Sequence, residues 1–593
     1  MTLTLKVAKS GGVLYNLTNN IETGKSFNVI ILFALFCICY VFLDETKLLN
    51  KWQSVCCSIF LVINPSVLAQ LFTYYTDGIL YQMLLLCFVA LLYLTFYNRG
   101  KYVNLCWFLI FLSINIGFNI KFSAIIFLAI LCLSFAGYWL FLKIKTDGFN
   151  KKTILYFKNA FLIMAGSVLS GTLITGSTSY IINSIRHHNP LYTMIGEGST
   201  EMITSQLPNA FKDISNIERF VASLFSFTSN SKKLEEVQWK MPLFFSNGEF
   251  GAAQGNDTRV AGWGMLFSGI LLISLVVISF YLVKKENKFI KAKPITLILF
   301  VVYNLAICVV PGLSWARYNL VIFWIVIAAL IYIFINYNQK NNNNSITLFS
   351  SGIIVALLFI NMVPCLLLNY YKFKEYDNIQ TQLAKFKIIT EYNDVTVSVG
   401  SYDMYGRIFN LYDNKINKFT VDDIDINNCD GKVFDTQPIY YDIKDGIMST
   451  DNLIDFLSYY DENKILLIAA KDEASKNLKT NDIQAMHSIG LQIDLSNHYR
   501  WSYLAVLNGD DVIYENMADE QITFTDNIDN IQVSMLSAGY EKGNLASIVI
   551  NGEEFALNER GLNIVVYDKI GDNVMDSICI DTFSDNKLTR MLP

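Results

Sequence analysis

The chain has 593 residues, of which 53% are hydrophobic and only 16% are charged, and its mean hydropathy is +0.36. Soluble globular domains carry about 25% charged residues, so the composition argues against a wholly water-soluble protein. The net charge of −5 offers no basic excess for nucleic acid, and we expect no nucleic-acid partner.

The charges divide the chain into two regions of opposite sign. Residues 372–590 hold 37 acidic and 19 basic side chains, whereas the rest of the chain holds 14 acidic and 27 basic ones. The basic region is also the hydrophobic one. We therefore predict an N-terminal segment over 1–25, a transmembrane domain over 26–370 and a water-soluble domain over 371–593.

The predicted transmembrane domain contains ten runs with almost no charge. Each has about 17 to 23 residues, enough to cross a hydrocarbon core of about 30 Å at 1.5 Å per residue of helix. Asn64-Pro65 interrupts the second run, and the fourth and fifth runs meet closely at 119–121. We predict a polytopic α-helical membrane domain of about ten helices over 26–43, 53–69, 78–97, 103–119, 122–142, 159–181, 262–284, 295–313, 317–336 and 347–369.

The orientation follows from lysine and arginine, which stay on the cytoplasmic side when they lie in short connections. Basic residues cluster in the connections 99–101, 143–158 and 284–293. We predict a multi-pass protein of the plasma membrane with both termini, the long loop 182–261 and the whole tail outside. The first 25 residues lack the apolar core of a cleavable signal peptide. We therefore expect either a helix upstream of Met1 or an N-terminal tail that is translocated unaided.

The tail changes to short alternating or β-branched runs separated by Asp, Asn and Gly, which favours an α+β or sandwich-like domain. Asn551-Gly552 follows such a run and predicts a hairpin, because both residues tolerate a positive φ. Only Cys429 and Cys579 lie in the tail, and whether they form a disulfide stays open. No Cys/His spacing matches a zinc site.

Five stretches of the hydrophobic region resemble bacterial GT-C glycosyltransferases, multi-helix enzymes related to protein mannosyltransferases. The stretches are 14–25 (LYNLTNNIETGK), 70–78 (QLFTYYTDG), 188–192 (HNPLY), 257–259 (DTR) and 315–318 (WARY). The resemblance implies transfer of a sugar from a polyprenyl-phosphate donor to an extracytoplasmic glycan or protein. It also implies a catalytic acid on the first outer loop. The chain begins inside the matching loop, so we expect that acid upstream of Met1.

The tail resembles the interleukin-like EMT inducer (ILEI) domain, also found as an accessory module on glycosyltransferases, where sugar binding has been inferred. The stronger match comprises 546–552 (ASIVING), 560–568 (RGLNIVVYD), 576–577 and Phe583. A second match, 465–474 (ILLIAAKDEA) with 500–503 (RWSY), corresponds to the later half of the family but comes first here. We expect the tail to be permuted or to hold two copies, one of them incomplete.

The candidate site residues lie at predicted outer boundaries. Asp77 is the candidate catalytic acid, because acids at a membrane boundary are costly and often functional; the alternative is that it caps the next helix. Arg317 and Lys121 are candidates for gripping the donor phosphate, against the alternative that they only anchor helix ends in lipid headgroups. The outer placement and the GT-C resemblance put further residues in the substrate cavity: Tyr75, His188, Asp257, Arg259, Trp315 and Tyr318. The alternative for His188 is a plain surface role, and that for Asp257 and Arg259 is a pair with each other.

Three functions compete at this point. The first is a hexosyltransferase that uses a lipid-linked sugar. It needs no cofactor, and a divalent cation stays open. The second is an inactive or truncated GT-C homologue that acts as a glycan-binding scaffold. The third is a transporter of lipid-linked saccharide, which predicts internal repeats and paired charges in mid-membrane, and neither is visible in the sequence.

Overall fold

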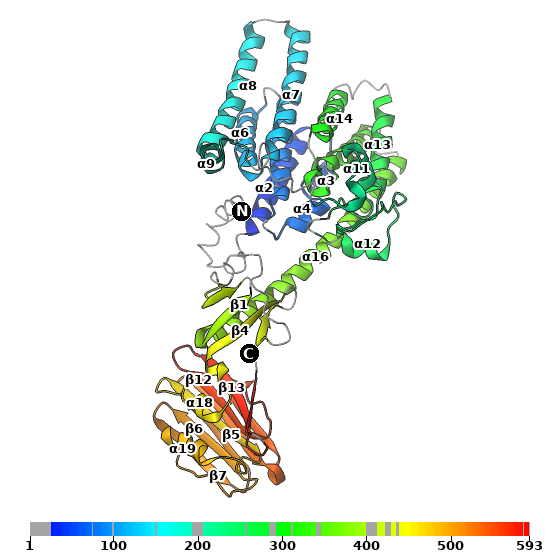
Figure 1. Cartoon of the computed structure of the whole chain (residues 1–593). Helices are drawn as coiled ribbons and strands as arrows, with labels where there is room; N and C mark the ends of the chain where they lie inside the picture. The colour runs from blue at the N-terminus through cyan, green and yellow to red at the C-terminus, as the bar shows by residue number, and fades with distance from the viewer. Residues whose placement is uncertain are drawn as a thin grey trace. The chain divides into compact units, whose positions relative to one another are not determined.

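The computed structural model (Figure 1) divides the chain into two compact units, Met1–Phe373 and Lys374–Pro593. The division lies close to the change of charge along the sequence. Each unit is described by itself below. The structure describes residues 25–591 apart from 74, 98–99, 149–150, 193–205, 254, 256–257, 284–291, 310–311, 313, 340–344, 399–408, 410–411, 421–428, 435–437 and 585.

The first unit is helical, and six helical segments of its described part are long and apolar enough to cross a membrane. This agrees with a membrane-embedded region. Ten spans are not confirmed: within the described residues, three further runs contribute apolar helical stretches of 10–17 residues. The six segments lie in α2 (Ser26–Glu45), α5 (Asp77–Phe96), α6 (Val103–Ile120), α7 (Ser123–Asp147), η6 (Leu320–Ile322) continued by α15 (Phe323–Gln339), and α16 (Ser345–Tyr392). The shorter ones lie in α3 (Lys51–Val62), α8 (Lys151–Leu169) with η2 (Ser170–Ile174), and α13 (Phe267–Val283), and α14 (Ala292–Val309) takes the eighth predicted run.

The second predicted span is broken by its own sequence. Helix α3 ends at Val62, and α4 (Pro65–Gln70) begins after an extended Asn64, whose side chain accepts a hydrogen bond from the Val67 amide at 3.0 Å. Proline at the first helical position has no amide hydrogen to contribute, so a new helix begins there. The break turns the chain toward the start of α5.

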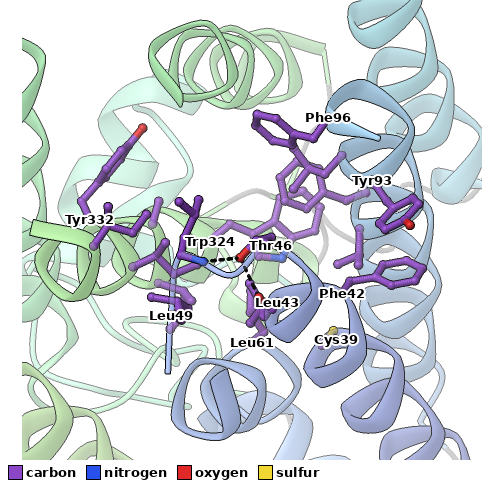
Figure 2. Close-up of a pocket in the computed structure, with 18 of the residues that line it drawn as sticks. Cys39, Phe42, Leu43, Thr46, Leu49, Leu61, Tyr93, Phe96, Trp324 and Tyr332 are labelled. Atoms are coloured by element: carbon purple, nitrogen blue, oxygen red, sulfur yellow. Dashed lines mark hydrogen bonds between the residues drawn. The ribbon is translucent and has the colours of Figure 1, made fainter. Parts of the chain in front are cut away.

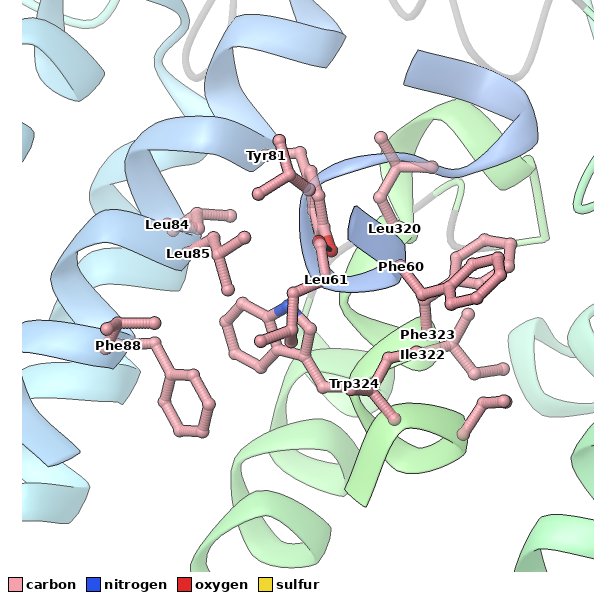
Figure 3. Packing of buried hydrophobic residues seen from close by; sticks show 14 of the residues in the cluster. Phe60, Leu61, Tyr81, Leu84, Leu85, Phe88, Leu320, Ile322, Phe323 and Trp324 are labelled. Carbon is pink, nitrogen blue, oxygen red and sulfur yellow. Dashed lines mark hydrogen bonds between the residues drawn. The ribbon is translucent and has the colours of Figure 1, made fainter. Parts of the chain in front are cut away.

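Helix α5 lies at the centre of the first unit and is buried over most of its length. Phe88 stacks on Trp324 of α15 with ring centroids 4.3 Å apart, and the Tyr81 hydroxyl donates to the Leu61 carbonyl at 2.5 Å (Figure 3). Large aromatic rings with one satisfied polar group fix neighbouring helices in a single arrangement. The first half and the middle of α5 are therefore held in place.

The long loop 182–261 is largely folded where it is described. Ser223 Oγ donates to the Ser314 carbonyl at 2.6 Å and accepts from the Ala261 amide at 3.0 Å, so the loop is tied to the 315–318 turn. A small apolar cluster, which includes Val260 and Trp315, lies between them. The loop elements are α9 (Ser177–His187), η3 (Asn209–Phe211), α11 (Asn216–Leu224) and α12 (Asn247–Ala252).

The second unit is β-rich, which confirms the predicted strand content of the tail. A four-stranded sheet has the order β2-β1-β4-β3, and a ten-stranded sheet is built around β5. Helices α18 (Leu453–Leu457) and α19 (Thr480–Ser488) accompany them. The strands are β1 (Asn393–Ser398), β2 (Lys418–Thr420), β3 (Gly431–Val433), β4 (Ile439–Gly446), β5 (Lys464–Asp472), β6 (Ser502–Asn508), β7 (Asp511–Ala518), β8 (Ile522–Ile528), β9 (Ile531–Gly539), β10 (Leu545–Ile550), β11 (Glu553–Glu554), β12 (Gly561–Asp568), β13 (Asn573–Asp581) and β14 (Lys587–Arg590).

Strand β5 explains why its sequence is an unbroken apolar run. It pairs antiparallel with β6 and β12, and its last residues pair in parallel with β9. Alternate residues of β5 enter two different apolar clusters, so both of its faces are covered. The predicted Asn551-Gly552 turn is confirmed, since both residues have positive φ values of 51° and 88° between β10 and β11. Cys579 is a free thiol, so it forms no disulfide with Cys429.

Candidate functional site

Three predicted site residues that are far apart in the sequence meet at one end of the helical unit. Asp77 opens α5, Lys121 follows the last residue of α6, and Arg317 lies in η5 (Ala316–Tyr318) just before α15. Lys121 Nζ donates to Asp77 Oδ1 at 2.5 Å. The Asp77 side chain is 5% exposed and that of Lys121 is 31% exposed. Asp77 is therefore a buried carboxylate with an ammonium partner.

The ring of Tyr318 joins the two cations. Lys121 Nζ lies 3.9 Å from its centroid and Arg317 Cζ lies 4.6 Å from it, and Arg317 Nη2 donates to the Tyr318 hydroxyl at 2.5 Å. Trp315 stacks on Tyr318 with centroids 5.7 Å apart. Arg317 Cζ is also 5.8 Å from the centroid of Tyr75. We call this group the two-cation site; it consists of Tyr75, Asp77, Lys121, Trp315, Arg317 and Tyr318.

The two-cation site has the chemistry of an anion site at an apolar boundary. A guanidinium and an ammonium each donate charge-assisted hydrogen bonds, and partial burial strengthens them relative to water. Aromatic faces hold both cations by cation–π attraction, which limits the freedom of their side chains. The arrangement suits a phosphate attached to an apolar chain.

A small polar pocket lies beside the start of α5, and the sequence analysis missed it. Asn28, Gln70, Tyr75 and Gln82 contribute to its lining, and its volume is about 10 Å³, close to that of one water molecule. Gln70 Oε1 accepts from the Gly78 amide at 2.9 Å, next to Asp77. Within the described part of the chain, Gln70 Nε2, Asn28 Oδ1 and Gln82 Oε1 are buried without a hydrogen-bond partner. One donor and two acceptors of this kind suit a water molecule or a hydroxyl group.

The other predicted cavity residues have different settings. His188 is exposed at the end of α9 with a φ of 51°, and its neighbour His187 stacks on Tyr192. Arg259 donates to the Asn230 carbonyl at 2.7 Å and to Gln206, which holds the loop together. Asp257 lies outside the described residues. The part of the chain that the structure describes holds no group of three His, Cys, Asp or Glu side chains placed for a metal ion.

A second cavity, of about 200 Å³, lies between α2, α5 and α15. Apolar side chains from the C-terminal halves of α2 and α5 and from along α15 line it, among them Phe42, Tyr93 and Tyr332 (Figure 2). Neither a carboxylate nor a cation lines it. The cavity has room for hydrocarbon, and it offers no group for acid–base chemistry.

The comparisons with known proteins concern the second unit. Residues 416–508 match the model of the interleukin-like EMT inducer family. The matched range contains the resembling stretches 465–474 and 500–503 and ends before 546–583. No curated protein and no solved structure matches the chain. The resemblance of the helical unit to GT-C enzymes therefore rests on its own residues.

The three amide side chains of the small polar pocket could have been recognised from the sequence. Asn28 and Gln82 lie inside predicted apolar spans, and Gln70 lies at the end of another. A polar side chain within a membrane span is expensive unless it has a partner or a role. The sequence-based prediction relied on charge and therefore did not include these neutral side chains.

Proposed function

We propose that this protein is a membrane glycosyltransferase that moves a sugar from a polyprenyl-phosphate donor to a glycan or protein acceptor on the outer side of the plasma membrane. The observation that carries the proposal is the meeting of Lys121 and Arg317 on the ring of Tyr318, at the ends of apolar helices. A polyprenyl-phosphate donor has the matching parts, an anionic head and a hydrocarbon tail.

In the proposed reaction the acceptor hydroxyl attacks the anomeric carbon of the donor sugar. The bond between that carbon and the phosphate oxygen breaks, and its electron pair leaves with the phosphate. Lys121 and Arg317 stabilise the charge that develops on the leaving phosphate. The hydroxyl loses its proton to a base.

Asp77 fits a positioning role better than that of the base. Its Oδ1 already accepts a hydrogen bond from the Lys121 ammonium at 2.5 Å, so this oxygen is engaged with the cation rather than open to an acceptor hydroxyl. Asp77 would then orient Lys121 toward the phosphate. The amides around the small pocket are suited to take a hydroxyl of the transferred sugar, and the ILEI-like unit is suited to recognise the glycan acceptor.

The experiment is transfer of labelled sugar from a polyprenyl-phosphate donor by the full chain in proteoliposomes. Arg317→Ala should abolish transfer, Arg317→Lys should restore part of it, and Gln82→Leu should lower it by removing a partner for the sugar hydroxyl. Lys101→Met is the matched control, because Lys101 also contacts a ring, that of Tyr102, away from the two-cation site. Donor binding without transfer in the wild type would favour the scaffold function, and absence of donor binding would refute the proposal.

A further inference from the structure

The loop segment 239–245 exposes an unusual amount of apolar surface. Met241 is 77% exposed and Phe244 is 59% exposed, although soluble surfaces rarely carry contiguous apolar patches of this kind. We call it the apolar segment; its exposed large side chains are Trp239, Met241, Leu243, Phe244 and Phe245.

The one charged residue of this segment points the other way. Lys240 is buried, and its Nζ pairs with Glu249 Oε1 at 2.5 Å and donates to the Met265 carbonyl at 2.8 Å. Thr228 donates to the same carboxylate oxygen through its amide and its hydroxyl, at 2.9 and 2.7 Å. These bonds fix the apolar segment to the residues that precede α13.

The segment also contacts α13, on a side that carries exposed apolar residues. A Cβ atom on Gly269 would lie 2.3 Å from Leu243 Cγ, so the absence of a side chain there lets Leu243 approach the helix. Leu272 and Val276 follow Gly269 at helical spacings of three and seven residues and are exposed. The apolar segment therefore continues an exposed apolar stripe of α13.

The position of α16 indicates how deep the contact between the apolar segment and α13 lies in the membrane. Asn361 Nδ2 donates to the Trp263 carbonyl at 2.9 Å, and its Oδ1 accepts from the Leu266 amide at 2.8 Å. Tyr370 and Tyr371 are exposed farther along α16, where an aromatic pair marks a membrane interface. Asn361 lies roughly 13 Å before them along the helix axis, from a rise of 1.5 Å per residue. An interface at these tyrosines would put the 263–266 turn, whose Met265 carbonyl accepts from Lys240, inside a hydrocarbon core about 30 Å thick.

We propose that the apolar segment inserts among the lipid acyl chains of the leaflet on the side of the two-cation site. It forms one continuous lipid-contacting surface with the exposed stripe of α13. This surface is independent of the proposed transferase activity. Insertion of the apolar segment also sets how deep the loop lies in the bilayer relative to the two-cation site. Val260 and Ala261 of the loop pack in one cluster with Trp315 of that site.

The test measures the surroundings of Trp239 in the full chain, reconstituted in nanodiscs. The difference in fluorescence intensity between the wild type and the Trp239→Phe variant is the contribution of the Trp239 indole alone. Lipids brominated midway along an acyl chain quench indoles that touch hydrocarbon, and acrylamide quenches those that touch water. Trp501→Phe supplies the matched control, since Trp501 is exposed in the β-rich second unit.

We expect brominated lipid to remove about half or more of the Trp239 signal and acrylamide to remove little of it, given a depth of about 5–10 Å for inserted apolar faces. The Trp501 signal should show the reverse. Quenching of Trp239 by acrylamide alone would place the segment in water and overturn the proposal. Quenching by neither agent would mean that protein covers it, which also overturns the proposal.

Discussion

Replacing Lys121 by methionine removes one of the two cations from the Tyr318 ring while keeping a side chain of similar length. A hydrogen bond to a charged group contributes about 1.5–3 kcal/mol. Because the Lys121 side chain is 31% exposed, water shares its charge, and we take the lower part of that range, about 1.5–2 kcal/mol. Binding of a polyprenyl phosphate should therefore weaken about 10- to 30-fold, at 1.4 kcal/mol for each factor of ten.

Asp77→Asn separates the two roles considered for the carboxylate. The variant keeps the Lys121 cation and removes the negative charge beside it, so affinity for a phosphate ligand should not fall, and any change should be a gain. If Asp77 positions Lys121, turnover should fall by about tenfold. If Asp77 is the base, turnover should vanish while affinity is kept.

The assay is competition of polyprenyl phosphate against a fluorescent analogue bound to the full chain in nanodiscs, combined with the transfer assay. Lys101→Met again controls for general loss of positive charge. Wild-type affinity in Lys121→Met, or an equal loss of affinity in Lys101→Met, would refute the assignment of Lys121 to the phosphate.

Two further predictions concern charged pairs outside the two-cation site. Lys240→Met should leave the Glu249 carboxylate, whose side chain is 0% exposed, without its counterion, which costs about 3–5 kcal/mol for a buried pair. Limited proteolysis should then cut the 206–261 region faster, and adding Glu249→Gln should recover part of the resistance; unchanged cleavage would contradict this. In the second unit, the hydrogen bonds from Arg560 lower the pKa of Asp581 from 3.8 to about 2. A carboxyl whose pKa is lowered by folding stabilises the fold above about pH 4, and the stabilisation is lost as the pH falls toward 2. Solvent exposure limits it to under about 1 kcal/mol. Arg560→Gln should remove this part of the acid sensitivity in urea unfolding followed between those pH values, and an unaltered pH profile would count against it.

The sequence predicted the elements of the site better than their contacts. Trp315, Arg317 and Tyr318 adjoin one another in the chain, so their proximity is local. The pairing of Asp77 with Lys121 spans two helices and depends on how α5 and α6 pack, which no local pattern encodes. The distribution of charge along the sequence predicted that both residues lie at the same membrane boundary. The distance of 2.5 Å between Lys121 Nζ and Asp77 Oδ1 follows from helix packing.

The membrane spans illustrate a second limit. Hydropathy found the apolar runs correctly as helices, but it measures composition and not helix length. The second run has the composition of a span and is divided at Pro65, where the missing amide hydrogen ends one helix and starts another. In the tail, the apolar or β-branched runs that form β5 and its three partner strands were all recognisable as strands, but which strands pair was not.

The apolar segment shows why burial in this chain cannot be inferred from polarity alone. In water, exposing Met241 and Phe244 would cost about 25 cal/mol for each Å² of apolar surface, while Lys240 would be stable on the surface. In hydrocarbon the preferences reverse, because apolar side chains lose nothing there and an unpaired ammonium is expensive. Lys240 is buried against Glu249 while its apolar neighbours are exposed, which is the arrangement that hydrocarbon selects. On the proposed insertion, residues 239–245 belong to the membrane unit in their physical chemistry, and the outer-side placement of the loop 182–261 stays a prediction from the basic connections.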